Sequence, residues 1–294
     1  METSNAEILR QLARPLEPIP TGQAAVLQPL CGVRAVMFDV YGTLFVSDSG
    51  DVGTTRQELC RQAFSAAMEA LGIPSDGIAA RGVQYLADAI QESHQRSRSQ
   101  GIDHPEVDIV DVWRQVVAKL ATSGCLNGGG WDERRLGRLA VEYECRVNPV
   151  WPMPGLRPCL AALAEKGLAL GVVSNAQFYT PLLFPALLGQ AAESLGLASD
   201  LQFYSYRTGH AKPGLVLHRM AAEALGRRGI RPADAVYVGN DMLNDVYPAA
   251  QLGFRTALFA GDARSLRLHQ GDPRLDGLAP DLVLNDLGEL IGCV

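Results

Sequence analysis

The stretch Val33–Phe45, VRAVMFDVYGTLF, decides the fold. It contains a short apolar run, rich in β-branched and aromatic residues, around one acid, Asp39, and the run ends at Gly42-Thr43. This pattern predicts a buried strand of a parallel sheet that leads into a loop. A carboxylate at the end of a buried strand is costly without partners, and open α/β sheets bind ligands at the carboxyl ends of their strands. Asp39 is therefore a candidate reactive group, with capping of the loop as the plainer alternative.

The composition is that of an ordinary globular chain. It has 294 residues and a formal net charge of −6, which suits one large or two modest domains. Its basic residues are scattered, so the sequence lacks the positive patch that binds nucleic acids. The 6 cysteines form no CxxC pair, which is typical of reduced thiols. No apolar run reaches the roughly 18 residues of a membrane helix, and no signal-peptide core is present. We therefore expect a cytoplasmic protein that binds neither nucleic acid nor membrane.

The residues after the first strand predict a helical insertion. Apolar residues recur at helical spacing in four stretches, separated by glycine or proline. The stretches are 55–71, 78–95, 106–121 and 132–145. We expect them to form a small helical domain at 47–148. Residues 1–32 are an extension with one short helix at 6–12, and its course stays open, because it can fold over the core, contact a partner subunit or remain mobile.

Strands and helices alternate after the proline-rich return at 147–158. The predicted strands are 168–173, 201–204, 235–238, 255–259 and 281–284, and the predicted helices are 156–165, 181–195, 213–225 and 247–252. Such alternation predicts an α/β fold in which helices cover both faces of a parallel sheet. We expect this core to comprise 33–46 and 149–294.

Two later loops carry groups that can bind an anion. Ser174 and Asn175 follow the strand at 168–173, and a hydroxyl and an amide there can donate hydrogen bonds above the sheet. Lys212 precedes Pro213, which we expect to open a helix and so to orient the lysine. The plainer alternatives are a helix N-cap for Ser174 and a solvated surface position for Lys212.

A third loop is acidic. The strand at 235–238 ends at Gly239, and the loop then presents Asn240, Asp241 and Asp245. Carboxylate and amide oxygens in this number suit a hard cation such as Mg²⁺. The alternative is a turn rich in helix-capping residues.

The motifs together resemble those of the haloacid dehalogenase superfamily over about 33–290. Asp39-Val40-Tyr41-Gly42-Thr43 resembles its first motif, Asp-x-Asp-Gly-Thr, with Tyr41 in place of the second Asp. The resemblance implies a Rossmann-like core with an inserted helical cap. It also implies that Asp39 attacks the substrate to form a covalent aspartyl intermediate, which water then hydrolyses.

The resemblance assigns a role to each candidate residue. The catalytic residues are Asp39, Tyr41, Ser174 and Lys212, the substrate-binding residues are Thr43, Ser174, Asn175 and Lys212, and the Mg²⁺ ligands are Asp39, the Tyr41 carbonyl, Asn240, Asp241 and Asp245. The family carries an acid directly after the glycine of the fourth motif, where this chain has Asn240. Either Asn240 or Asp241 therefore serves as that ligand.

Tyr41 leaves three functions open. Tyrosine has a pKa near 10 and is a poor base at neutral pH, unlike the Asp of the family's phosphatases. A tyrosine here is similar to the 2-haloacid dehalogenase branch, which needs no metal, whereas the acidic loop favours a Mg²⁺-dependent phosphatase. A catalytically weak binding or regulatory protein is the third possibility. We favour the phosphatase of a small anionic metabolite, acting as a monomer or homodimer, because carboxylates without a cation would repel Asp39 and raise its pKa.

Overall fold

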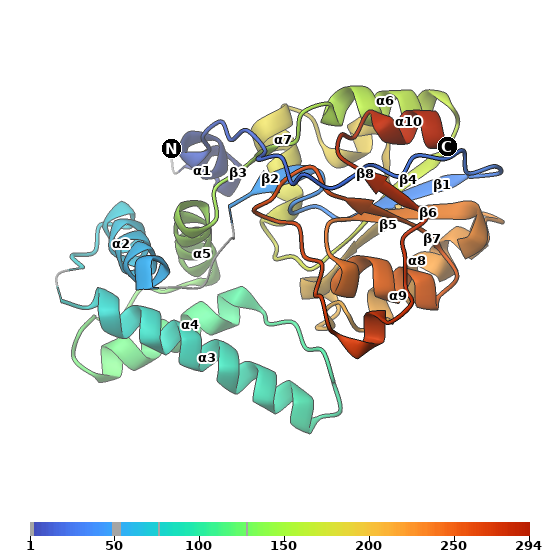
Figure 1. Ribbon diagram of the computed structural model, residues 1–294. Helices are drawn as coiled ribbons and strands as arrows, with labels where there is room; N and C mark the ends of the chain where they lie inside the picture. The colour runs from blue at the N-terminus through green and yellow to red at the C-terminus, as the bar shows by residue number, and fades with distance from the viewer. Residues whose placement is uncertain (1–2, 49–53, 76, 128) are drawn as a thin grey trace.

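A six-stranded parallel sheet forms the centre of the molecule. The computed structural model describes residues 3–48, 54–75, 77–127 and 129–294 (Figure 1). Within these residues the strand order is β5-β4-β1-β6-β7-β8, and every neighbouring pair is parallel. The strands are β1 (Ala35–Phe38), β4 (Ala169–Ser174), β5 (Leu197–Tyr204), β6 (Ala235–Gly239), β7 (Arg255–Phe259) and β8 (Leu282–Leu284). The predicted α/β fold is confirmed.

The strand order places the end of β1 at a switch point. The chain runs from β1 outward through β4 and β5, then returns to the other side of β1 and continues through β6, β7 and β8. Connections that leave in opposite directions open a crevice at the carboxyl ends of the two neighbouring strands. Asp39 is the residue that follows β1 and therefore borders this crevice.

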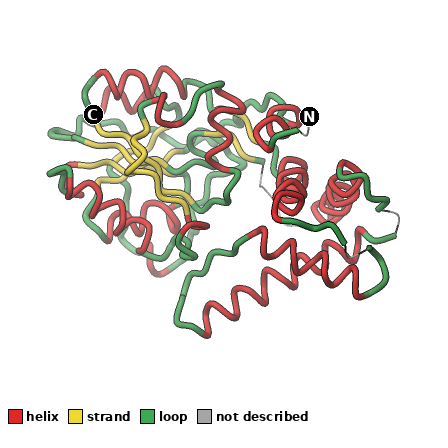
Figure 2. The backbone as a smooth tube through the Cα atoms, turned by 180° about the vertical axis from the view of Figure 1, so that it is seen from behind, coloured by secondary structure: helices red, strands yellow, loops and turns green. Residues whose placement is uncertain are grey.

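Helices cover both faces of the sheet (Figures 1 and 2). Side chains of β1 alternate between the faces, because Val36 and Phe38 belong to one apolar cluster and Ala35 and Met37 to another. The helices of this part are α6 (Leu156–Glu165), α7 (Leu183–Leu188), α8 (Val216–Arg227), α9 (Tyr247–Gln251) and α10 (Glu289–Cys293). The stretch at 181–195 is expected to be helical with a break at Pro185, but Pro185 lies inside α7, and the helix ends instead where Gly189 adopts a left-handed conformation (φ 65°).

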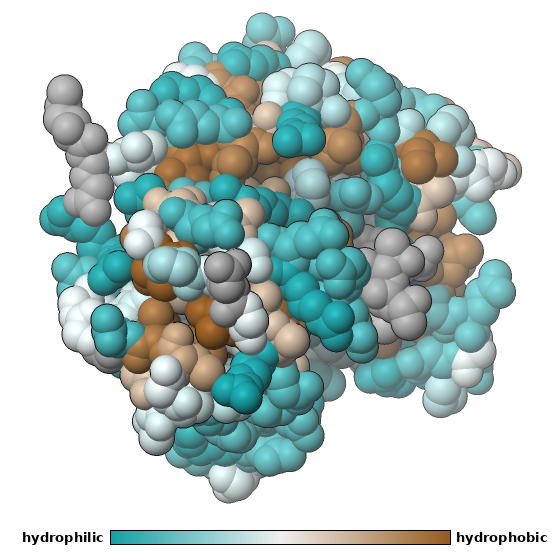
Figure 3. Space-filling model, turned by 90° about the vertical axis from the view of Figure 1, so that its left-hand side faces the viewer, coloured by the Kyte–Doolittle hydropathy of each residue, from teal (hydrophilic) through white to brown (hydrophobic). Residues whose placement is uncertain are grey.

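Four helices pack beside the sheet as a separate bundle. They are α2 (Thr54–Ala70), α3 (Ala79–Ser99), α4 (Ile109–Thr122) and α5 (Glu133–Val147). Phe64 of α2 stacks on Trp113 of α4, with ring centroids 5.9 Å apart, and Trp113 contacts Tyr143 of α5 at 5.2 Å. On the side that carries the bundle, hydrophilic side chains dominate the surface and apolar ones show mainly in recesses (Figure 3). The bundle thus buries its apolar stripes inward.

Two regions join the bundle to the sheet. The antiparallel strands β2 (Phe45–Ser47) and β3 (Val150–Pro152) lie where the chain leaves and re-enters the sheet part. The connection expected at 47–53 falls mostly outside the described residues. The connection between α3 and α4 makes a second contact with the sheet part. There, Glu106 N donates to Gly209 O at 2.9 Å, and Ala211 N donates to His104 O at 2.8 Å. Because this segment pairs with the core, α4 begins at Ile109, later than the predicted helix at 106–121. The domain boundaries themselves stay predictions.

The N-terminal extension folds over the sheet part. Helix α1 (Asn5–Leu12) contacts both α5 and α7, and Ser4 caps it by accepting from Glu7 N. Farther along, Ile19 N donates to Asp262 Oδ1 at 3.0 Å, and Val26 forms an antiparallel bridge with Val283 of β8. Of the three courses that the sequence leaves open, the extension follows the first. Among the described helices, none combines the length and apolar content that a membrane crossing requires.

Candidate active site

Asp39 is held at the start of a tight turn. Its N–H donates to Val238 O at 2.9 Å, and the residue is 7% exposed. The turn closes because Val40 O accepts from Phe45 N at 2.9 Å. Gly42 has φ +80°, and a Cβ there would lie 2.5 Å from Ser265 Cβ. The turn that carries Asp39 therefore requires glycine at this position.

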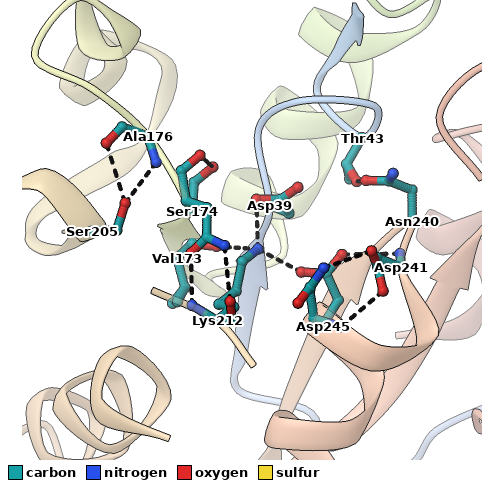
Figure 4. Close-up of polar contacts among 12 residues, drawn as sticks. Asp39, Thr43, Val173, Ser174, Ala176, Ser205, Lys212, Asn240, Asp241 and Asp245 are labelled. Atoms are coloured by element: carbon teal, nitrogen blue, oxygen red, sulfur yellow. Dashed lines mark hydrogen bonds and ion pairs between the residues drawn. The ribbon is translucent and has the colours of Figure 1, made fainter. Parts of the chain in front are cut away.

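Lys212 is the centre of the polar cluster (Figure 4). Its ammonium lies 2.8 Å from Asp39 Oδ1 and 2.5 Å from Asp245 Oδ1. It also lies 3.2 Å from the Tyr237 hydroxyl and 3.3 Å from Val173 O. Burial lowers the pKa of Lys212, but the two carboxylates outweigh burial and hold that pKa above its usual value. Lys212 is thus a permanent cation that is shared between two aspartates.

Asn175 fixes the main chain of Lys212. Lys212 N donates to Asn175 Oδ1 at 2.7 Å, and Asn175 Nδ2 donates to Lys212 O at 3.1 Å. The prediction that Pro213 opens a helix is wrong, because α8 begins only at Val216. The lysine is therefore oriented by the end of β4 rather than by a helix.

Asp245 uses both carboxylate oxygens inside the protein. Oδ1 accepts from Lys212 and from the Tyr237 hydroxyl at 3.0 Å, and Oδ2 accepts from Asp241 N at 3.0 Å. Gly239 leaves room for this carboxylate, since a Cβ there would lie 2.3 Å from Asp245 Cγ. Burial raises the pKa of Asp245, and Lys212 opposes that rise. Asp245 is fully buried and anchors the lysine.

Asn240 is oriented by two neighbours. Its Oδ1 accepts from the Thr43 hydroxyl at 3.1 Å, and its Nδ2 donates to Ser265 O at 2.6 Å. Thr43 is fully buried and so acts on the loop through Asn240. A carboxamide oxygen has a second lone pair, which this arrangement leaves for another partner.

Asp241 caps the turn that follows it. Its Oδ1 accepts from Leu243 N and Asn244 N at 2.8 Å each, at the start of the π-helical turn Met242–Val246. His269 Nε2 lies 2.9 Å from the same oxygen. The capping alternative considered for this loop is therefore realised by Asp241, although its side chain also borders the cavity described below.

Tyr41 and Ser174 do not present reactive hydroxyls. The Tyr41 hydroxyl lies 2.9 Å from the Thr180 hydroxyl, and burial raises the pKa of Tyr41 above its usual value, with Glu144 adding to the rise. Ser174 is fully buried, and among the described residues its hydroxyl reaches only Asn175 O, at 3.4 Å. Neither hydroxyl has the geometry of an acid or base at Asp39.

A cavity of about 270 Å³ lies over these groups. It is lined by Asp39, Tyr41, Asn175, Lys212, Asn240, Asp241, Asn244, Asp245, Ser265 and Arg267. The structure thus brings together all of the predicted site residues except Thr43 and Ser174, which lie beneath the cavity. The sequence analysis assigned no role to Tyr237, Asn244, Ser265 or Arg267. Asn244 is the second amide of the predicted acidic loop, whereas Arg267 lies in a loop without any motif.

The cavity offers oxygen donors for a cation. Among the described residues, no three His, Cys, Asp or Glu side chains form a ready metal cluster. Oδ2 of Asp39 and the carbonyl of Tyr41 nevertheless accept no hydrogen bond from a described residue, and Asn240 and Asp241 border the same space. Hard oxygen donors of this kind fit Mg²⁺, which takes only one or two carboxylates from a protein.

Three comparisons relate this chain to known proteins. The sequence model of one protein family, the haloacid dehalogenase-like hydrolases, matches residues 33–253 of this chain. The ribulose-1,5-bisphosphate 5-phosphatase of Halopiger xanaduensis is 28% identical over 48% of this chain and 56% of that protein, so the match spans little more than half of that relative. The glyceraldehyde 3-phosphate phosphatase of Methanopyrus kandleri is 25% identical over 89% of this chain and 97% of that protein. A solved 2-haloacid dehalogenase from Pseudomonas syringae has a TM-score of 0.55 and 19% identity over 88% of this chain and 96% of its own, which shows the fold alone.

Proposed function

The chain belongs to the haloacid dehalogenase-like hydrolases, and we propose that it is a Mg²⁺-dependent phosphatase of a small phosphorylated metabolite. The observation that carries this proposal is the pairing of one free oxygen of Asp39 with the donors Asn240 and Asp241 at the same cavity. Attack on a haloacid would need no such donors. Two curated relatives that carry phosphatase names support the same choice.

In the proposed reaction, Asp39 is the nucleophile. One carboxylate oxygen of Asp39 attacks phosphorus, so that an oxygen–phosphorus bond forms, the bond to the ester oxygen breaks and the alcohol leaves with a proton from water. A water molecule then attacks the aspartyl phosphate, releases phosphate and restores the carboxylate. Lys212 fixes the Asp39 carboxylate through the 2.8 Å contact to Oδ1. The N–H groups of Val40 and Tyr41 donate to no described residue and can bind the phosphoryl oxygens.

We propose a smaller ligand set than the resemblance implies. The cation would be held by Asp39, the Tyr41 carbonyl and one of Asn240 and Asp241, where Mg²⁺ supplies positive charge against the phosphoryl oxygens. Asp245 is outside this set in our proposal, because it is fully buried and its oxygens bind Lys212, Tyr237 and Asp241 N. Asp241 also has both oxygens in hydrogen bonds, with Oδ2 accepting from Asn244 Nδ2 at 2.8 Å, but it keeps some exposure at the cavity.

The other assigned roles follow from position. Thr43 and Ser174 are proposed to position the loops around the substrate rather than to contact it. We propose that water is the proton donor, since the Tyr41 hydroxyl is bonded to Thr180. Helices α2–α5 are proposed to act as the cap that selects the substrate, within the domain 47–148.

Phosphate release tests the function. We expect the protein to release phosphate from members of a phosphomonoester panel when Mg²⁺ is present, to lose this activity with a chelator and to regain it with added Mg²⁺. Halide release from a panel of 2-haloacids, measured without metal, is the parallel assay, because Tyr41 and the fold also favour a dehalogenase. Halide release without phosphate release would establish that alternative. Neither activity, together with tight capture of a partner protein, would establish a binding protein.

A further inference from the structure

Lys212 has no hydrogen left for a substrate. An ammonium has three N–H donors, whereas this one already faces four acceptors: Asp39, Asp245, the Tyr237 hydroxyl and Val173 O. Two of these acceptors are carboxylates, so the lysine charge is balanced within the protein. An anionic substrate must therefore find a fixed positive charge of the protein elsewhere in the cavity.

Arg267 is the other cationic side chain that lines the cavity. Its main chain is fixed by the acidic loop, since Arg267 N donates to Asn240 O at 3.0 Å and Met242 N donates to Arg267 O at 2.8 Å. Its Nη1 donates to Arg264 O at 2.7 Å and to Leu266 O at 3.0 Å. The guanidinium is thus held in place from one side.

The charge of Arg267 is not balanced by a carboxylate. Two arginines of the same region form ion pairs, Arg264 with Asp262 at 3.2 Å and Arg274 with Asp272 at 2.6 Å. Among the described residues, no carboxylate lies within the 4.0 Å of an ion pair from Arg267. Its Nε and Nη2 accordingly remain as a fork of donors, which matches a carboxylate or phosphate in two-point contact.

The position of Arg267 differs from that of the reacting group. The transferred phosphoryl group must lie against Asp39, where the N–H groups of Val40 and Tyr41 are free, and Arg267 makes no hydrogen bond with any of these residues. The cavity is lined by Asp39 as well as by Arg267, so a single substrate that fills it can contact both.

We propose that Arg267 binds a second anionic group of the substrate. The preferred substrates are then small phosphate esters that also carry a carboxylate or a second phosphate. This inference rests on the proposed phosphatase function and names its substrate class. It also makes the loop at 262–269, rather than the helical bundle alone, a determinant of specificity.

Matched substrate pairs test this role. We would compare 3-phosphoglycerate with glycerol 3-phosphate, and a pentose bisphosphate with the pentose monophosphate, in the wild type and in Arg267→Gln, Arg267→Lys and Arg274→Gln. Loss of a charge-assisted contact predicts that Arg267→Gln lowers kcat/KM about 10- to 100-fold for the members with a second anion and about threefold or less for the others. Arg267→Lys should fall between, because it keeps the charge without the fork. Arg274→Gln should match the wild type.

The two pairs distinguish the sources of the second anion, because a carboxylate and a phosphate are tested separately. Equal losses within both pairs would mean that Arg267 binds the transferred group or supports the fold, and an unchanged preference would mean that it binds neither. Either result overturns the proposal.

A binding measurement separates this proposal from the phosphatase function. Asp39→Asn and the double variant Asp39→Asn/Arg267→Gln would be titrated with 3-phosphoglycerate and with glycerol 3-phosphate by calorimetry. We expect about tenfold or more weaker binding of 3-phosphoglycerate in the double variant and little change for glycerol 3-phosphate. If the wild type shows no turnover, the phosphatase function is refuted, but the binding role of Arg267 is not. If the two variants bind 3-phosphoglycerate equally, or if neither binds it, Arg267 does not bind the second anionic group.

Discussion

Glu106 supports the sharpest stability prediction, because its half-buried carboxylate joins the helical bundle to the segment that ends at Lys212. Oε2 accepts from the Ser205 hydroxyl at 2.6 Å, and Oε1 accepts from Gln177 Nε2 at 3.0 Å and from Val107 N at 2.9 Å. We would compare Glu106→Ala with Glu106→Gln, which has nearly the same shape. The pair separates the loss of acceptors from the loss of charge.

The two substitutions should differ clearly in free energy of unfolding. Glu106→Ala removes the acceptor of three donors, of which Gln177 and Ser205 keep a second partner in Val107 O and Ala176 O. With unsatisfied buried groups at about 1–3 kcal/mol each, we expect a loss of about 2–4 kcal/mol. In Glu106→Gln, the Ser205 hydroxyl can turn its hydrogen to Ala176 O and accept from the new amide. We therefore expect a change of about 1 kcal/mol or less.

The pH dependence should also differ. Burial raises the pKa of Glu106 in the folded protein, although hydrogen bonds from Ser205, Val107 and Gln177 partly oppose the rise. A carboxyl whose folded-state pKa is raised takes up its proton first in the folded state, so stability falls as the pH rises from the unfolded pKa, near 4.3, through the raised folded value. Glu106→Gln lacks this proton. Its stability relative to the wild type should therefore increase from about pH 5 to about pH 8.

Urea denaturation at the two pH values checks both statements, and Glu223→Gln, an exposed position on α8, is the control. Phosphate release should fall in Glu106→Ala and persist in Glu106→Gln, because Ala211 N and Gly209 O pair with the bundle just before Lys212. An alanine variant within about 1 kcal/mol of the wild type, or a glutamine variant as unstable as the alanine variant, would refute the reasoning.

Three further predictions concern the reacting centre. Asp39→Asn should lower turnover at least about 10³-fold while circular dichroism and unfolding stay near wild type, and retained turnover would remove Asp39 as the nucleophile. Lys212→Met should cost about 3–5 kcal/mol by leaving two buried carboxylates unpaired, and adding Asp245→Asn should restore part of that loss in urea denaturation, whereas strict additivity would argue against their coupling. Tyr41→Asp should raise phosphatase activity, up to about 10²-fold, if the missing acid limits the rate, while Tyr41→Phe should leave the activity unchanged. A fall or no change with Tyr41→Asp in steady-state assays would count against that account.

Much of the fold follows from local patterns. The apolar run before Asp39 and the alternation after 147–158 are enough to predict a parallel sheet with helices on both faces, because buried strands and amphipathic helices have distinct periodicities. The errors lie at element ends. Pro213 is compatible with a first helical turn, yet α8 begins at Val216. Glu106 pairs with Gly209 of the core, and α4 begins only after Asp108, which caps it.

The site is predictable only in part, because side-chain directions depend on distant partners. The sequence places an acidic loop beside Asp39. It cannot show that both carboxylate oxygens of Asp245 accept hydrogen bonds within the protein, from Lys212, Tyr237 and Asp241 N. Arg267 lies outside every motif, and only the folded chain brings it to the cavity. The catalytic and ligand roles themselves stay predictions until the variants are measured.

The course of the extension also has a consequence for how the molecule avoids self-association. Val26 pairs with Val283, and the main chain at 19–30 runs along the outer side of β8, the last strand of the sheet. An uncovered terminal strand offers free N–H and C=O groups to a second molecule. A form of the protein that began at Arg34 would expose that template and should aggregate through strand addition. The residues at 19–30 would then shield the edge of the sheet from a second molecule.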